Sequence, residues 1–342
     1  MYTMKKKIVT FGEIMMRLSP KSNKRFSQAE DFKINFGGAE ANVAVLLANL
    51  GIHSTFVSKL PENPIGDMVE RYLDSNRVDT SYIAYGGERL GVYYFENGNS
   101  VRSSKVVYDR KSSAMSTSKK GDFSFEEVFK DADWFHFSGI TAALGENCVE
   151  ALKEAIKVAK KNDVKISVDL NYRSKLWDYG TFKTVMRELI KDVDLCIGWI
   201  DLNSKSNEFT PVSFKDEVEE KDYFIKVFGE MNKELNVGLV ATTIRETFST
   251  SRNSLRGVIF DGDKLIASNK YEFDITDRVG AGDAFAAGLL CELANDKDIK
   301  EALEFAVASG VYKHTIEGDA SIASYEEIKG ITTGILAGGV AR

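Results

Sequence analysis

Short apolar segments alternate with longer segments of helical periodicity along most of the chain. Near-continuous apolar runs include KIVTFGEIMMRL at 7–18, WFHFSG at 134–139 and VGLVATTI at 237–244. Runs of this kind are typical of strands that are buried on both faces of a sheet. Between them lie segments such as AEANVAVLLANLG at 39–51, where apolar residues recur at helical spacing before a glycine. The alternation predicts βαβ units, and therefore an α/β fold with a mainly parallel sheet.

Two polar segments with alternating character interrupt this rhythm, at about 14–36 and about 90–112. The second contains Glu-Asn-Gly-Asn at 96–99, which is a hairpin turn signal. We expect both segments to form antiparallel strands beside the main sheet, as a small β-sheet lid over a site. Periodicity alone is also compatible with plain surface hairpins.

Composition excludes several classes of protein. The 45 Lys and Arg residues against 51 Asp and Glu residues give a net charge of −6, which favours neither nucleic acid nor an anionic membrane as a partner. No apolar run reaches the roughly 18 residues of a transmembrane helix, and no signal peptide is expected. The three cysteines are far apart, which predicts buried free thiols. These observations predict a cytoplasmic protein. The length is compatible with one large domain, with or without a small appendage, or with two domains, and the prediction is a single domain over 1–342.

The stretch DRVGAGDAFAAG at 277–288 combines a glycine turn with the start of a helix. It is a poor dinucleotide fingerprint, because Phe285 stands where a third small residue is needed. It is not a Walker A loop, because Asp283 and Ala284 stand where Lys and Ser or Thr are needed. What remains is a helix N-terminus whose free N–H groups suit a phosphate or a developing negative charge.

Asp283 in this turn has two interpretations. It could be an ordinary helix N-cap. It could instead be a general base that takes a proton from a substrate hydroxyl, while neighbouring amides stabilise charge on a transferred phosphoryl group. The second interpretation predicts a phosphotransferase.

Two strings carry a resemblance to a known family. DRVGAGDAF at 277–285 resembles the C-terminal signature of the PfkB (ribokinase-like) carbohydrate kinases, and NFGGAEANVAVLLANLG at 35–51 resembles their N-terminal signature. The resemblance extends from residue 8 to about residue 328. It implies a three-layer α/β/α ribokinase-like core with a small β-sheet lid. It also implies a carbohydrate kinase that uses ATP, with Mg²⁺ held through the phosphates rather than by dedicated protein ligands.

The resemblance also implies roles for individual residues. Asp283 matches the catalytic base, with Gly280, Ala281 and Gly282 as its anion hole. The positions that line the sugar are Gly37, Gly38 and Asn42. The positions implied for the nucleotide are Arg278, Ser309 and Lys313, although Ser309 and Lys313 could equally belong to a core helix with a basic last turn.

Within the family, YDRKSSAMS at 108–116 and DLNYRSKLW at 169–177 resemble the kinases of 2-keto-3-deoxygluconate. The residues that would hold the keto-deoxy acid are Tyr93, Tyr108, Arg110 and Arg173. Guanidinium groups suit a carboxylate because they bind it bidentately. Arg173 follows a strand at the sheet edge where open α/β folds bind ligands. Either arginine could instead be a surface charge, and either tyrosine could serve in packing.

The chain departs from the family pattern at two places. Trp199 and Leu202 occupy the positions of the usual Asn-x-x-Glu motif, and Arg245 stands where a glycine normally lets the nucleotide approach. These changes affect nucleotide and metal binding rather than the base.

Three functions are compatible with the sequence. The first is ATP-dependent phosphorylation of 2-keto-3-deoxy-D-gluconate at the C6 hydroxyl, in sugar-acid catabolism. The alternatives are a PfkB-family kinase for a neutral sugar such as fructose, and a non-catalytic sugar-binding regulator. The resemblance also implies a homodimer that forms through the lid, since an exposed sheet edge would otherwise be prone to association.

Overall fold

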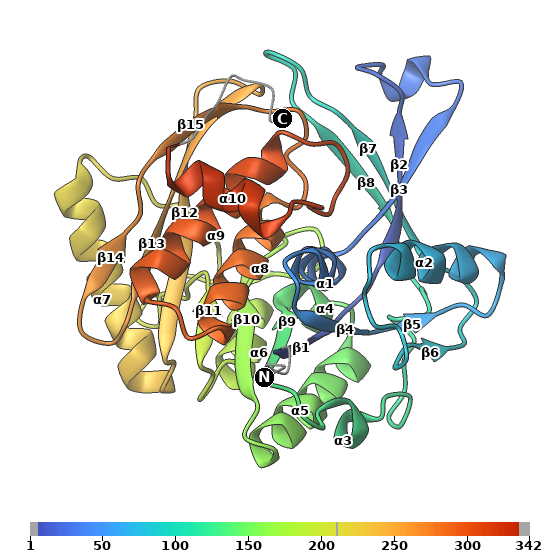
Figure 1. Ribbon diagram of the computed structural model, residues 1–342, viewed down its shortest axis with the longest axis horizontal. Coiled ribbons are helices and arrows are strands. Elements are labelled where there is room, and N and C mark those ends of the chain that lie inside the picture. The colour runs from blue at the N-terminus through green and yellow to red at the C-terminus, as the bar shows by residue number, and fades with distance from the viewer. Residues whose placement is uncertain (1–5, 210, 335–342) are drawn as a thin grey trace.

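The computed structural model describes residues 6–209 and 211–334. A nine-stranded sheet crosses its centre in the order β14-β13-β12-β11-β10-β9-β1-β4, with β15 also paired to β13 (Figure 1). Strands β12, β11, β10, β9, β1 and β4 are parallel neighbours, and the other pairings are antiparallel. The strands are β1 (Lys7–Phe11), β4 (His53–Val57), β9 (Trp134–Ser138), β10 (Lys165–Asp169), β11 (Leu195–Ile197), β12 (Leu239–Thr247), β13 (Arg252–Phe260), β14 (Leu265–Ala267) and β15 (Tyr271–Asp274).

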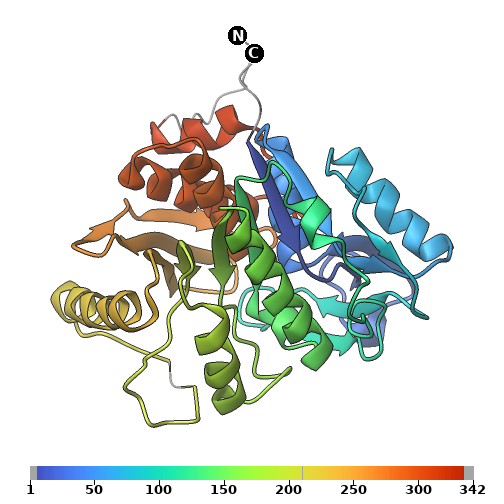
Figure 2. The same ribbon diagram turned by 90° about the horizontal axis from the view of Figure 1, so that it is seen from below.

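Helices cover both faces of this sheet and form the outer two layers (Figure 2). One face packs against α3 (Phe125–Val128), α5 (Glu146–Lys161), α6 (Tyr179–Leu189) and α7 (Glu217–Leu235). The opposite face packs against α1 (Ala39–Asn49), α8 (Ala281–Ala294), α9 (Ile299–His314) and α10 (Tyr325–Thr332). The predicted α/β/α architecture is therefore confirmed, because strands buried on both faces need a helical layer on each side.

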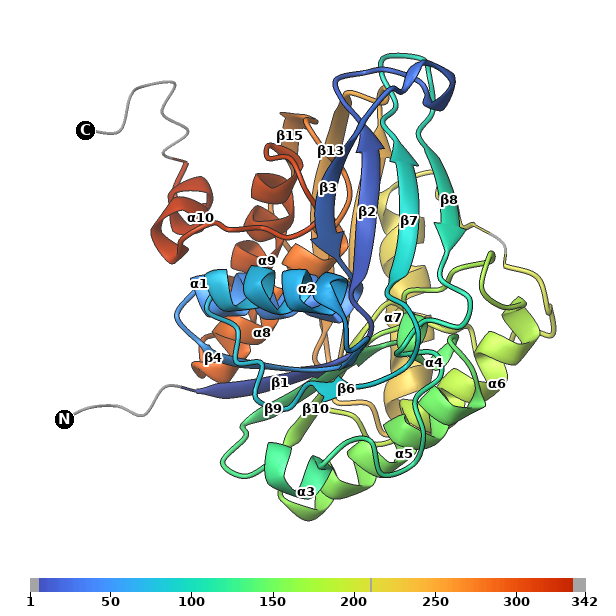
Figure 3. The ribbon, with the colours of Figure 1, turned by 90° about the vertical axis from the view of Figure 1, so that its right-hand side faces the viewer.

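A second, separate sheet has the order β3-β2-β7-β8. It stands beside α1 and α2 (Pro64–Ser75) and rises away from the main sheet (Figure 3). Its strands are β2 (Met15–Pro20), β3 (Phe32–Gly37), β7 (Gly91–Glu96) and β8 (Lys105–Asp109). They come from the two predicted segments, but the central pair, β2 and β7, is parallel rather than antiparallel. Since β2 and β7 belong to different segments, no hairpin turn sets their direction.

The remaining short elements are the 3-10 helix η1 (Phe26–Gln28), the helix α4 (Gly139–Ala142) and the strand pair β5 (Lys59–Leu60) and β6 (Ala84–Tyr85). They connect the larger elements and add no further layer.

Two expectations from composition concern the cysteines and membrane insertion. All three cysteines are free and buried, as predicted. Across residues 6–209 and 211–334, no helix combines the length and apolar character needed to cross a bilayer.

Candidate active site

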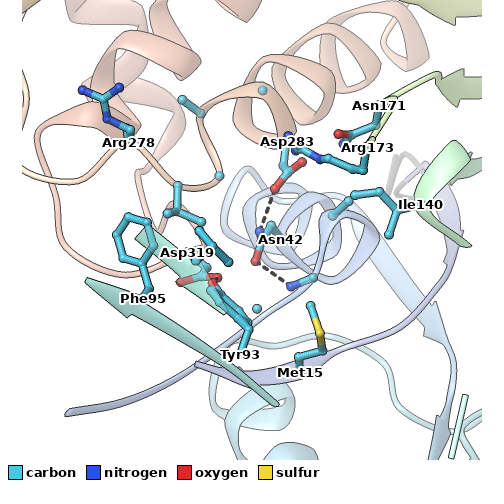
Figure 4. Close-up of a pocket in the computed structure, with 18 of the residues that line it drawn as sticks. Met15, Asn42, Tyr93, Phe95, Ile140, Asn171, Arg173, Arg278, Asp283 and Asp319 are labelled. Atoms are coloured by element: carbon cyan, nitrogen blue, oxygen red, sulfur yellow. Dashed lines mark hydrogen bonds between the residues drawn. The ribbon is translucent and has the colours of Figure 1, made fainter. Parts of the chain in front are cut away.

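A cavity of about 450 Å³ lies between the carboxyl ends of the parallel strands and the small sheet (Figure 4). Clefts at this edge are the usual ligand sites of open α/β sheets. Most of the residues predicted to form the site line this cavity. They are Gly37, Gly38, Asn42, Tyr93, Tyr108, Arg110, Arg173, Arg278, Gly280, Ala281, Gly282 and Asp283.

The glycine turn places the N-terminus of α8 at the wall of the cavity. Gly280 is the N-cap of α8 and has φ 82°, a left-handed conformation that favours glycine. A Cβ atom at this position would also overlap the carbonyl oxygen of Asp319. No side chain caps the helix, and the space beside Gly282 is open. The first-turn N–H groups of α8 are therefore available to an anion.

Asp283 occupies the first turn of α8 but does not cap it, so the N-cap interpretation is wrong. Its Oδ2 accepts a hydrogen bond of 2.7 Å from Nδ2 of Asn42 (Figure 4). Burial raises the pKa of Asp283 to about 6, although the Asn42 hydrogen bond and the charge of Arg173 oppose that shift. A carboxyl group with this pKa is largely ionised at neutral pH and can still accept a proton, as a general base must.

Asn42 lies in the first turn of α1 and is buried. While its amide nitrogen donates to Asp283, its Oδ1 accepts from the N–H of Gly38 at 3.4 Å. The side chain is fixed at both ends, and it therefore orients the Asp283 carboxylate.

Arg110 lines the cavity, but its charge is already neutralised. Nε of Arg110 donates to Oε2 of Glu13 at 2.9 Å, and Nη2 donates to the same oxygen. Both side chains are buried, and Ser113 donates to the other oxygen of Glu13. That Arg110 binds the keto-deoxy acid stays a prediction: the residue lines the cavity, but its guanidinium already forms an ion pair with Glu13, which lies between β1 and β2.

Arg173 has no such partner. No ion pair or side-chain hydrogen bond involves its guanidinium group in the part of the chain that the structure describes. It lies beside Asp283 in the cavity (Figure 4), and its charge lowers the pKa values of Asp283 and Asp169 against the effect of burial. It is free to bind an anionic ligand at the position where Asp283 would act.

The two predicted tyrosines differ. Tyr93 is buried, and its hydroxyl donates to Oδ2 of Asp319. Tyr108 is 39% exposed, and its ring centroid lies 6.0 Å from that of Tyr93. Tyr108 can therefore offer its hydroxyl to a ligand, whereas Tyr93 offers mainly its ring.

The partner of Tyr93 belongs to a buried ionic network that we name the Arg17 network: Arg17, Asp277, Asp319 and Tyr93. Arg17 lies 2.8 Å from both Asp277 and Asp319, and all three side chains are at most 3% exposed. Asp277 in turn accepts hydrogen bonds from the backbone of Val279 and Gly318. The network fixes strand β2 of the small sheet to the glycine turn.

Ser309 and Lys313 do not reach the cavity. Both are fully buried in α9, where Ser309 donates to the carbonyl of Phe305 and Lys313 donates to the carbonyl of Ile316. Their predicted side-chain contact with a nucleotide is corrected to the core-helix interpretation. The side chain of α9 that does line the cavity is His314.

Asp169 is a site residue that the sequence-based prediction missed. It ends β10, lines the cavity and accepts a hydrogen bond of 3.0 Å from the N–H of Asn171. Burial, followed by the charge of Asp283, raises the pKa of Asp169 to about 7. The sequence did contain an indication that Asp169 belongs to the site, because this carboxylate directly follows an apolar strand at the ligand-binding edge of the sheet.

The residues at the two altered motif positions pack in or against the hydrophobic core. Trp199 donates from Nε1 to the hydroxyl of Tyr223 at 3.1 Å and packs edge-on against Phe224. Leu202 is buried in the same hydrophobic cluster. Neither residue lines the cavity.

The fold and the site define a class: a ribokinase-like fold with a buried carboxylate beside an uncapped helix N-terminus at the cavity. Residues 5–198 and 256–323 match the sequence profile of the pfkB family carbohydrate kinases. The chain belongs to this family and is a carbohydrate kinase.

Two relatives and one more distant structure resemble the chain over nearly its whole length. It is 30% identical to a 2-dehydro-3-deoxygalactonokinase of Haloferax volcanii, over 96% of each chain. The crystal structure of 2-dehydro-3-deoxygluconokinase from Thermotoga maritima superimposes with a TM-score of 0.90 at 41% identity, covering 96% of this chain and 100% of that one. A fructokinase from Xylella fastidiosa with bound ATP has a TM-score of 0.74 at 20% identity, covering 97% and 99%, and shows the fold alone.

Proposed function

We propose that the protein phosphorylates 2-keto-3-deoxy-D-gluconate at its C6 hydroxyl with ATP, giving 2-keto-3-deoxy-6-phosphogluconate in sugar-acid catabolism. The observation that carries this proposal is the guanidinium of Arg173 beside Asp283 in the cavity, which has no ion-pair partner among residues 6–209 and 211–334. A sugar acid would bring a carboxylate to Arg173 and a hydroxyl to Asp283. The two relatives named as kinases of 2-dehydro-3-deoxy sugar acids support the same substrate class.

The proposed reaction needs one proton transfer and one displacement. Asp283 accepts the proton of the C6 hydroxyl, and the C6 oxygen forms a bond to the γ-phosphorus. The bond between that phosphorus and the β–γ bridging oxygen breaks, and ADP leaves with the electron pair. The N–H groups of Gly280, Ala281 and Gly282 stabilise the charge on the transferred group.

Magnesium would supply charge neutralisation on the phosphates. No group of three His, Cys, Asp or Glu side chains in residues 6–209 and 211–334 is arranged to hold a metal ion. The donor set fits an ion held mainly by phosphate oxygens and water, with the carboxylate of Asp169 available on the cavity wall.

The pKa of Asp283 predicts how activity depends on pH. The base must be ionised, and its pKa is raised to about 6, so kcat/KM should fall on the acid side of about pH 6 by roughly tenfold per pH unit. A profile of kcat/KM between about pH 5 and about pH 8 checks this expectation. An acid limb near the ordinary carboxyl pKa of about 4 would contradict it.

Replacing Arg173 with Ala should raise KM for 2-keto-3-deoxygluconate by about 10- to 100-fold, because a charge-assisted bidentate contact is lost. The measurement is ATP-dependent phosphorylation with 2-keto-3-deoxygluconate, its galactonate epimer, fructose, ribose and gluconate. Arg187, an exposed arginine on α6, provides the matched control, and its Ala variant should behave as the wild type. Unchanged kinetics in Arg173→Ala would contradict the assignment of the carboxylate to Arg173.

The same panel tests the alternatives. Because Arg110 is paired with Glu13, the case against a neutral sugar depends on Arg173 alone. A preference for fructose would favour the neutral-sugar kinase. Sugar binding without phosphorylation of any substrate would favour the regulator, although the available helix N-terminus beside Asp283 supports catalysis.

A homodimer through the small sheet remains a prediction, as does a cytoplasmic location. Phe32, Ile34 and Val107 on that sheet are 38%, 48% and 54% exposed, which supports an apolar contact surface for a second copy.

A further inference from the structure

Three guanidinium groups that line the cavity have no carboxylate partner in residues 6–209 and 211–334: those of Arg173, Arg245 and Arg278. The side chain of Arg278 donates one hydrogen bond, of 2.7 Å, to the carbonyl of Thr250, and the side chain of Arg245 makes no hydrogen bond within those ranges. Like charges in one cavity repel each other, and an anionic ligand would relieve that repulsion.

The three charges come from different parts of the cavity wall. Arg173 lies beside Asp283, and its charge acts on the carboxyl groups of Asp169 and Asp283. Arg278 donates to the carbonyl of Thr250 in the turn that follows β12, and Arg245 lies on β12, so these two cations belong to the same end of the cavity. Figure 4 shows Arg278 and Arg173 on opposite sides of Asp283. Burial, then the charge of Arg278 and then that of Arg173, lowers the pKa of Arg245, so the like charges act on one another across the cavity.

His314 gives an independent indication that a ligand belongs at this end. Its Nδ1 lies 2.7 Å from the carbonyl oxygen of Gly310, so Nδ1 carries the proton and Nε2 is an acceptor. Nε2 is buried and has no hydrogen-bond partner among the described residues. Burial lowers the pKa of His314 to about 4, which keeps the ring neutral. An unpaired buried acceptor beside two cations fits a ligand that carries both hydroxyl groups and a charged phosphate chain.

We propose that Arg245, together with Arg278, binds the phosphate chain of the donor nucleotide. Arg245 lies on β12 and lines the cavity, and a forked guanidinium group can bind phosphate oxygens bidentately. The proposal rests on the proposed function only in taking a nucleoside triphosphate as the donor, and it makes Arg245 the residue that selects a polyphosphate.

Calorimetric titration of the full chain without sugar tests this role. The probes are ATP, inorganic tripolyphosphate and adenosine. Arg245→Met should bind ATP and tripolyphosphate about 10- to 100-fold more weakly, with adenosine affinity unchanged. Arg245→Lys should recover part of that loss. Arg252→Met removes a charge from the exposed surface of the neighbouring strand β13, and it should change none of the three affinities.

Equal ATP and tripolyphosphate affinity in the wild type and Arg245→Met would overturn the proposal. The proposal would also be overturned if Arg245→Met weakened only the binding of the sugar acid, because that result would make Arg245 a residue that binds the acceptor sugar. Should Arg245→Met fail to fold, Arg245→Lys and Arg278→Met are measured instead, and wild-type affinity for tripolyphosphate in both would overturn the proposal equally. Failure of the proposed function would be detected separately, by the substrate panel, because the loss of ATP affinity is measured without any sugar.

Discussion

Asp283→Asn should lower kcat by about a thousandfold, because the amide cannot accept the proton of the substrate hydroxyl. The replacement is nearly isosteric, and its side-chain oxygen can still accept the hydrogen bond from Asn42. We therefore expect the variant to fold and to bind sugar with wild-type affinity. Steady-state kinetics measure the first effect, and sugar titration measures the second.

The control for this variant is Asp263→Asn, which removes a carboxylate from an exposed turn. It should leave kcat and KM unchanged. If Asp283→Asn kept more than about a tenth of the wild-type kcat, Asp283 would not be the general base. A fall in sugar affinity equal to the fall in kcat/KM would instead make Asp283 a binding group.

Arg17→Met should lower the free energy of unfolding by about 3–5 kcal/mol. Arg17 neutralises both Asp277 and Asp319 in a region that is closed to water. Methionine fills much of the same volume but removes the ion-pair partner of two buried carboxylates. Urea unfolding followed by circular dichroism measures the loss.

Arg89→Met is the matched control on the same side of the molecule. Arg89 pairs with Asp109 at 2.7 Å, but both side chains are at least 36% exposed. Exposed ion pairs contribute about 0–1 kcal/mol, so this variant should unfold close to the wild-type midpoint. Similar losses in Arg17→Met and Arg89→Met would show that burial of the Arg17 network adds little to stability.

The sequence predicted those elements of the fold that follow from a local sequence pattern. Alternating strands and helices indicated the parallel sheet, and the glycine turn indicated a helix N-terminus beside Asp283. The family resemblance then supplied residues such as Asn42 and Tyr93, which do line the cavity. These predictions succeeded because each depends on local backbone conformation or on a recognisable motif.

Contacts between distant residues could not be predicted in the same way. Glu13 neutralises Arg110 across 97 positions, and Arg17 reaches Asp319 across 302. No sequence pattern near any of these residues identifies its distant partner. The choice between the two interpretations of Ser309 could not be made from the sequence, because α9 carries apolar residues around most of its circumference and leaves no polar stripe to mark a ligand-facing side.

The Arg17 network has a consequence for how the protein is made. Arg17 is synthesised long before Asp277 and Asp319, and Asp319 lies 302 positions further along the chain. Until both carboxylates have been synthesised, the guanidinium lacks these two partners, so β2 lacks this connection to the glycine turn. Asn42 likewise cannot donate to Asp283, which lies 241 positions further along, until that residue has been synthesised. Both connections are therefore non-local and can form only late in synthesis, and a product that ended before Asp277 would lack them both.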